Sequence, residues 1–187
     1  MKAAAPPVSS EPHAEVVAAV AKWSQEFIEQ RHDVFGGLPV CPFAKAARLK
    51  DTIRFEVRSF VMDDPLDTDG PIMSLVREFA RQARMGVIET LFVIHPDRAQ
   101  RLQDLEAFVQ RLNHRLAAGE LREFQAFEAH PESHFSVGGV LTRRAPYPSF
   151  QILSRRLLKN GSDALLGSSY YDRFTPDMLR AVGMPRP

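Results

Sequence analysis

The apolar run Thr90–Ile94, followed directly by His95 and Pro96, constrains the fold more than any other segment. Its residues, TLFVI, do not alternate between polar and apolar side chains. A short unbroken apolar run that stops at a proline is typical of a strand buried on both faces. A sheet with two covered faces has helices packed on it, so the run predicts the central strand of an α/β domain.

Two further strands and several amphipathic helices are predicted around this run. Residues 52–61 alternate, with apolar side chains on one face and Arg54, Glu56 and Arg58 on the other, as in a half-exposed strand. Residues 121–130 predict a third strand, which again ends at a His-Pro pair. Apolar residues recur every three or four positions in the other long segments, which predicts helices. These segments are residues 14–32, 71–86, 97–119 and 149–159.

Strands that alternate with single helices predict an α/β fold in a single domain. Such βαβ crossovers favour a small three- to four-stranded, mostly parallel sheet flanked by helices. The length of 187 residues and the apolar content of 44% suit one globular domain. We expect this domain over residues 13–160, a flexible N-terminal tail over residues 1–12, and a C-terminal extension over residues 161–187 that is packed on the domain or partly flexible.

Composition argues against several classes of partner and location. With 24 basic and 23 acidic residues the net charge is +1, so neither nucleic acid nor a membrane is expected as a partner. No apolar run approaches the roughly 18 residues of a membrane-spanning helix. The first twelve residues, MKAAAPPVSSEP, are too short and too rich in proline for a signal peptide, and a single cysteine cannot form an internal disulfide. We therefore expect a cytoplasmic protein.

Two histidines that each precede a proline, His95 and His130, are expected at one edge of the sheet. The residue before a proline is extended, so each histidine ends its strand. Open α/β sheets bind ligands beyond the carboxyl ends of their parallel strands. If the segment around Cys41 folds over that edge, a thiolate and two imidazoles come together. An antiparallel third strand would separate the two histidines.

A site made of Cys41, His95 and His130 has two chemical uses. The three side chains are possible ligands of a divalent transition metal such as zinc, iron or copper, with a position left for water or substrate. Alternatively, the thiolate attacks an electrophile while a histidine handles the proton. The structural alternative is that Cys41 is a small buried apolar residue and that each histidine is a polar strand end that hydrogen-bonds the backbone.

A second candidate site is the sequence Arg143-Arg144-Ala145-Pro146-Tyr147-Pro148. Two guanidinium groups beside a tyrosine held by prolines suit binding of a carboxylate or a phosphate. Arg143 and Arg144 would bind the anionic group, and Tyr147 is a further candidate residue of this site. The alternative is a proline-braced loop with solvated arginines.

Four motifs occur along the chain in a fixed order: Cys-Pro-Phe-Ala from Cys41, a strand ending in His95-Pro96, Ala-His-Pro around His130, and Arg-Ala-Pro-Tyr-Pro from Arg144. In this combination the chain resembles an uncharacterised family of small bacterial proteins, classed as a domain of unknown function, from about Trp23 to about Leu158. The family usually has serine where this chain has Ala145. The resemblance implies no mechanism, but it marks residues to test: Cys41, His95, His130, Arg144 and Tyr147.

Three functions follow as hypotheses. The first is a small enzyme that acts on an anionic small molecule, with Cys41 as metal ligand or nucleophile, His95 and His130 as ligands or acid–base groups, and Arg144 as the substrate clamp. The second is a haem-binding protein in which the Cys41-Pro42 pair presents a thiolate to iron. The third is a non-catalytic partner protein whose amphipathic helices and arginine-rich loop bind another protein.

Overall fold

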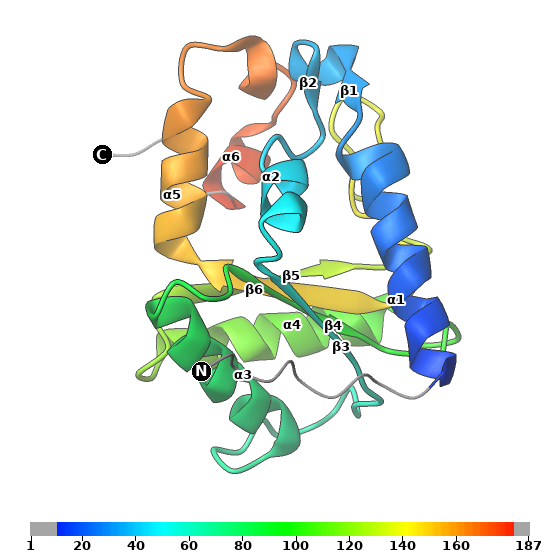
Figure 1. The fold of residues 1–187 in the computed structure, drawn as a ribbon, viewed down its shortest axis with the longest axis vertical. Coiled ribbons are helices and arrows are strands. Elements are labelled where there is room, and N and C mark those ends of the chain that lie inside the picture. The colour runs from blue at the N-terminus through cyan, green and yellow to red at the C-terminus, as the bar shows by residue number, and fades with distance from the viewer. Residues whose placement is uncertain (1–10, 182–187) are drawn as a thin grey trace, which may run out of the picture.

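A mixed four-stranded sheet in the order β3-β4-β6-β5 runs through the middle of the protein, with helices on both faces (Figure 1). The structure is a computed structural model that describes residues 11–181. The strands of this sheet are β3 (Ile53–Val57), β4 (Thr90–Ile94), β5 (Phe124–Ala129) and β6 (Ser149–Ser154). Most of the predicted N-terminal tail and the last six residues of the predicted C-terminal extension lie outside the described residues.

The sheet is mixed, which corrects the expectation of a mostly parallel sheet. Of the three strand pairings in this sheet only that of β3 with β4 is parallel, because β6 is antiparallel to both of its neighbours, β4 and β5. The first half of the segment 149–159 was expected to be helical. Phe150 and Ile152 also alternate with Ser149 and Gln151, and this strand pattern prevails because Phe150 and Ile152 then enter the core. Helix α5 (Arg155–Ala164) begins only after β6, where the Ser154 hydroxyl accepts a hydrogen bond from the first turn.

Two helices cover the face of the sheet that is drawn downward in Figure 1, α3 (Pro71–Arg84) and α4 (Leu102–Ala117). Their apolar sides meet those of the strands in the main core. Phe108 of α4 packs on Phe60 and Phe150, with ring centroids 5.2 and 5.7 Å apart, and Phe79 of α3 packs on Phe124 at 5.3 Å. Burial of these rings is a main source of the stability of the fold.

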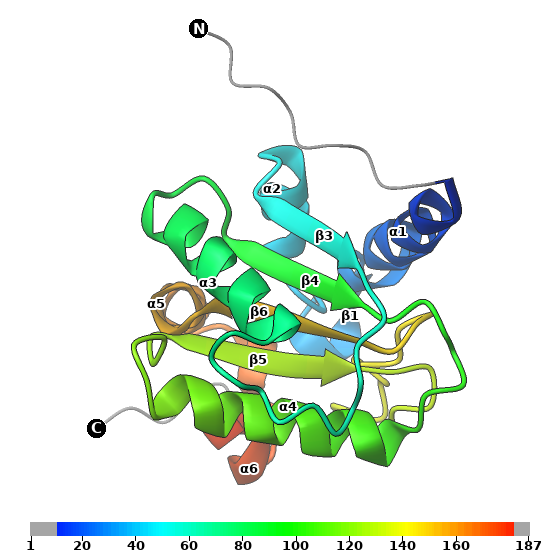
Figure 2. The ribbon, with the colours of Figure 1, turned by 90° about the horizontal axis from the view of Figure 1, so that it is seen from below.

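The opposite face carries α1 (Glu11–Trp23), the π-helical turn η1 (Ser24–Ile28), α2 (Ala44–Leu49) and α5. In Figure 2, seen from below, α3 and α4 lie in front of the sheet and this face is turned away. Val16 and Val20 of α1 pack on Ile94 and on the partly buried rings of Phe55 and Phe92. Helix α1 therefore covers the β3–β4 half of this face. None of the described helices is both long enough and apolar enough to cross a membrane.

A smaller cluster lies above this face and ties the two ends of the described chain together. It contains the antiparallel pair β1 (Arg31–His32) and β2 (Leu38–Pro39), the short helices η2 (Asp33–Phe35) and η3 (Ser169–Tyr171), and α6 (Pro176–Ala181). The Tyr170 ring packs on Phe35 at 5.3 Å, and its hydroxyl donates a hydrogen bond to the carbonyl of Val40. The C-terminal part of the chain thus holds the segment that leads into Cys41.

Asn113 of α4 pairs with the outer edge of β5, which generates a stability prediction. Its Oδ1 accepts from the N–H of Ala126 at 2.8 Å, and its Nδ2 donates to the Ala126 carbonyl at 2.9 Å. Because Asn113→Ala leaves both backbone groups without partners, we expect the free energy of unfolding to fall by about 1–3 kcal/mol. Urea denaturation measures this loss. Gln110→Ala, an exposed position of the same helix, is the control, with a change expected within about 0.5 kcal/mol.

Candidate functional site

His95 and His130 lie at one edge of the sheet, with the start of β6 between them. Because β6 is antiparallel to both β4 and β5, the latter two strands run in the same direction and end at the same edge. The N–H of His95 donates to the carbonyl of Pro148, just before β6, at 2.9 Å. The N–H of His130 donates to the carbonyl of Arg143 at 2.9 Å. Both histidines are therefore fixed to the loop that precedes β6.

The imidazole rings of both histidines form hydrogen bonds with nearby backbone groups. Nδ1 of His95 accepts from the N–H of Asp97 at 3.1 Å, and Nδ1 of His130 accepts from the N–H of Glu132 at 3.0 Å. Nε2 of His130 then carries the proton and donates to the carbonyl of Gln100 at 2.7 Å. The two residues are 6% and 1% exposed. The rings close the His-Pro turns, which is the structural alternative considered for these residues.

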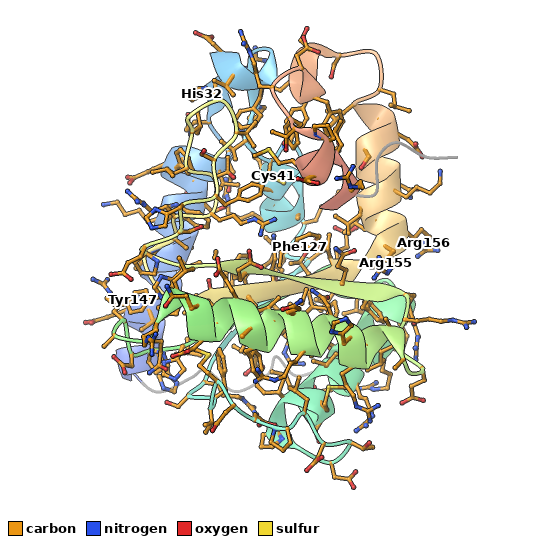
Figure 3. All side chains as sticks on the ribbon, turned by 180° about the vertical axis from the view of Figure 1, so that it is seen from behind. His32, Cys41, Phe127, Tyr147, Arg155 and Arg156 are labelled. Atoms are coloured by element: carbon orange, nitrogen blue, oxygen red, sulfur yellow. The ribbon has the colours of Figure 1, made fainter. Side chains whose placement is uncertain are left out.

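Cys41 does not join the two histidines. It lies over the sheet face that carries α1, α2 and α5, on the side of Phe127. Tyr147 lies at the end of the sheet (Figure 3). Its N–H donates to the carbonyl of Ile28 at 3.0 Å, and the Tyr170 bond fixes the residue before it. Among the described residues, no three histidine, cysteine, aspartate or glutamate side chains gather as a metal site. The expected metal-ligand set of Cys41, His95 and His130 is thus not assembled.

The Cys41 thiol lies just before the first turn of α2 in a half-buried position. Burial raises its pKa, the backbone N–H groups of Phe43 and Ala44 act in the opposite direction, and the negative charge of Glu29 raises it further. Desolvation is the largest of these effects, since it disfavours the charged thiolate. At neutral pH Cys41 is therefore predominantly a thiol.

The arginine-rich loop before β6 is largely engaged within the protein. Arg143 forms an ion pair with Glu128 on β5, and its guanidinium lies 4.0 Å from the ring centre of Phe135. The Tyr147 ring is half-buried against α1, with the guanidinium of Arg98 over it at 4.2 Å. Arg144 is exposed. Of the predicted anion-binding residues, only Arg144 has its charged group free of an ion pair in the described part of the chain.

A basic hollow of about 530 Å³, which the sequence did not suggest, lies between η1 and α2. Its lining residues are Gln25, Glu29, Gln30, Arg31, Lys45 and Arg48. Three cationic side chains thus surround a single carboxylate. Arg31 and Lys45 are exposed, and neither forms an ion pair with a described residue. The residues that line the hollow therefore carry more positive than negative charge, which suits an anion.

Glu29 and Arg48 form the floor of this hollow. Nε and Nη2 of Arg48 donate to the two carboxylate oxygens of Glu29 at 2.9 and 2.7 Å, the bidentate geometry of a strong pair. The Glu29 side chain is 3% exposed and that of Arg48 is 34% exposed. Chiefly the hydrogen bond from Arg48 lowers the pKa of Glu29. Glu29 also follows a π-helical turn, a feature frequent at functional sites.

The hollow and Cys41 are parts of one local structure. Cys41 hydrogen-bonds the residue that precedes Glu29, and Lys45 follows Cys41 by four positions on the same short segment. The Glu29 charge acts on the Cys41 thiol. The only signal for this grouping in the sequence is that Lys45 directly follows the Cys-Pro-Phe-Ala motif, because Glu29 lies just after η1 and Arg31 lies in β1.

The family described as "Protein of unknown function (DUF1415)" matches residues 15–168. The chain belongs to this family. The matched range includes Cys41, His95, His130 and the whole lining of the hollow, and it ends just before η3. No curated protein and no solved structure matches the chain.

The raised pKa of the Cys41 thiol predicts the pH dependence of its alkylation. The thiolate is the reacting form, and an unperturbed thiol is about nine-tenths converted one unit above its pKa of about 8.5. We expect the alkylation rate of Cys41 by iodoacetamide to keep rising above that range, whereas the rate of the urea-unfolded chain levels off. Mass spectrometry of quenched samples gives both rates. Coincident pH profiles would contradict the prediction.

The lowered pKa of Glu29 predicts how stability depends on pH. The native pKa lies below the unfolded value of about 4.3, so the ionised pair stabilises the fold above that pH. This contribution is lost as the pH falls through the native pKa. We expect Glu29→Gln to lower the thermal midpoint at pH 7 and to differ progressively less from the wild type below pH 4. Glu26→Gln, whose exposed carboxylate forms an ion pair with Lys22 at 3.8 Å, should change little at either pH.

Proposed function

We propose that this protein is a small thiol-dependent enzyme that binds an anionic small molecule in the basic hollow and uses Cys41 as its nucleophile. The observation that carries the proposal is the unneutralised pair Arg31 and Lys45 at a hollow whose carboxylate, Glu29, also acts on the Cys41 thiol. The hollow supplies binding and orientation, and the neighbouring thiol supplies reactivity.

Charge at the hollow supports an anion as the ligand. Arg48 donates to both carboxylate oxygens of Glu29, so the charges of these two side chains offset each other. Arg31 on β1 and Lys45 on α2 remain as the groups that bind a carboxylate or a phosphate from two sides. Arginine offers two parallel donors and lysine a mobile point charge, a combination suited to an oxyanion.

Cys41 has backbone donors in place for the charged form of its sulfur. In the reaction, the thiol proton leaves to solvent and the sulfur lone pair forms a bond to an electrophilic carbon of the bound molecule. The leaving group departs with the electrons of the broken bond. The N–H groups of Phe43 and Ala44, which hydrogen-bond the sulfur, stabilise the thiolate before the attack.

The two histidines have no part in this proposal. The His130 ring is buried and uses both nitrogens for backbone hydrogen bonds, so it has no free lone pair or proton to exchange with a ligand. Nδ1 of His95 is engaged in the same way. The metal-dependent version of the enzyme gains no support from the described residues, because no three histidine, cysteine, aspartate or glutamate side chains among them gather as a metal site.

Alkylation by a charged and a neutral reagent tests binding and reactivity together. In both reactions the Cys41 thiolate displaces iodide, but iodoacetate is an anion and iodoacetamide is not. We expect Lys45→Ala or Arg31→Ala to lower the ratio of the iodoacetate rate to the iodoacetamide rate by up to about ten-fold, because each removes one attractive charge. Inorganic phosphate at low ionic strength should slow the iodoacetate reaction of the wild type selectively.

Lys50→Ala is the matched control, because Lys50 is an exposed lysine that caps the same helix and lies outside the hollow. Its rate ratio should equal that of the wild type. Equal ratios for all variants, with no protection by phosphate, would show that the hollow does not present anions to Cys41. The proposal would then be wrong.

A further inference from the structure

The β3 edge of the sheet has no hydrogen-bonding partner among the described residues. The carbonyl of Thr52 accepts from the first residue of β4 at 3.2 Å, and the N–H of Arg58 donates to the last residue of β4 at 3.0 Å. The even-numbered residues therefore bond to β4. Because successive residues direct their N–H and C=O groups to opposite sides, those of Ile53, Phe55 and Val57 point outward.

The opposite edge of the sheet, formed by β5, is occupied by the chain itself. The Asn113 side chain takes both the N–H and the C=O of Ala126. Four residues further along, the outward N–H of His130 donates to the carbonyl of Arg143. Proteins block exposed strand edges in such ways to prevent pairing with other chains. Within residues 11–181, side chains block the β5 edge but not the β3 edge, which singles out β3 as the edge available for pairing.

We propose that a second copy of the chain pairs with β3 through an antiparallel β3–β3 contact centred on Phe55. In this register Phe55 faces Phe55 of the other copy, Ile53 faces Val57, and Arg54 faces Glu56 on both sides of the two-fold axis. A shift of the axis by one residue sets Arg54 against Arg54 or Glu56 against Glu56. Opposite charges across an antiparallel pair are favourable and like charges are not, so charge selects this register.

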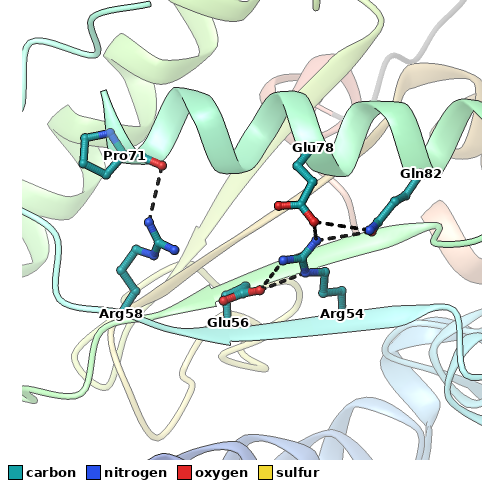
Figure 4. A network of polar contacts seen from close by, with 6 residues as sticks. All are labelled: Arg54, Glu56, Arg58, Pro71, Glu78 and Gln82. Atoms are coloured by element: carbon teal, nitrogen blue, oxygen red, sulfur yellow. Dashed lines mark hydrogen bonds and ion pairs between the residues drawn. The ribbon is translucent and has the colours of Figure 1, made fainter. Parts of the chain in front are cut away.

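The charged pair that selects the register lies at the β3 edge. Nε of Arg54 donates to Oε1 of Glu56 at 2.8 Å, and its Nη1 donates to Glu78 on α3 at 2.9 Å (Figure 4). The side chains of Arg54 and Glu56 are 23% and 25% exposed. They are thus oriented by α3 but still accessible from the edge. In the paired form each meets its opposite charge from the other copy.

Exposed apolar residues flank β3 symmetrically. Leu49 lies four residues before the strand and Val61 four residues after it. They are 69% and 65% exposed, more than the other exposed large apolar residues described. Antiparallel pairing brings the start of one β3 next to the end of the other, so Leu49 and Val61 both lie towards the ends of the contact. Burial of either side chain there adds an apolar contribution.

The first experiment measures association by sedimentation equilibrium of the full chain. We expect a species of twice the 21.1 kDa chain mass. Leu49→Glu and Val61→Glu should each weaken association about ten-fold or more, because each places a charge in an apolar contact. Leu166→Glu is the matched control. Leu166 is 57% exposed and follows α5 at the end remote from the sheet, so its variant should associate like the wild type (Figure 1).

Disulfide cross-linking tests the register in a Cys41→Ser background. Arg54 and Glu56 of opposite copies occupy a pair without backbone hydrogen bonds, where the chains are closest. An oxidised mixture of Arg54→Cys and Glu56→Cys chains should cross-link into dimers, whereas either variant alone should not. A monomer at every concentration, association unaffected by Leu49→Glu and Val61→Glu, or equal cross-linking in the unmixed samples would overturn the proposal.

Discussion

The insertion of β6 between β4 and β5 decides where the candidate residues lie. Because two antiparallel pairings follow each other, β5 keeps the direction of β4 while being separated from it by a full strand. His95 and His130 therefore share an edge without converging, and the loop before β6 is held against both by hydrogen bonds. The same insertion leaves β3 at one edge of the sheet and β5 at the other. The Asn113 side chain hydrogen-bonds the backbone of the β5 edge, whereas the β3 edge has no such partner among the described residues.

The sequence predicted most of the elements but not their assembly. The apolar run Thr90–Ile94 is the buried inner strand it was expected to be, and the helical periodicity over residues 71–86 and 97–119 corresponds to α3 and α4. Strand β6 was missed because its residues fit two periodicities at once. The strand forms because β6 can pair with both β4 and β5, and these pairings join segments that are far apart in the sequence.

The candidate site shows the same limit. Cys41 was singled out by its chemistry, but the His-Pro motifs are local turns in which each ring accepts from the residue two positions on. His32, which precedes no proline, makes the same contact with the N–H of Val34 at 3.2 Å. In the structure the histidine of each motif hydrogen-bonds the backbone of its own turn. The hollow was invisible in the sequence because Glu29 and Arg48, which form its floor, are 19 positions apart.

The hydrogen bond from Tyr170 to Val40 joins residues 130 positions apart, next to the only cysteine. Tyr170 lies just beyond residues 15–168, the range matched by the family. The ribosome synthesises Val40 and Cys41 before Tyr170, so this hydrogen bond forms late. The cysteine leaves the ribosome long before Tyr170, and N-terminal parts of a chain begin to fold first. Its thiol is therefore more accessible in the nascent chain than in the finished protein, which makes it most open to oxidation or modification during translation.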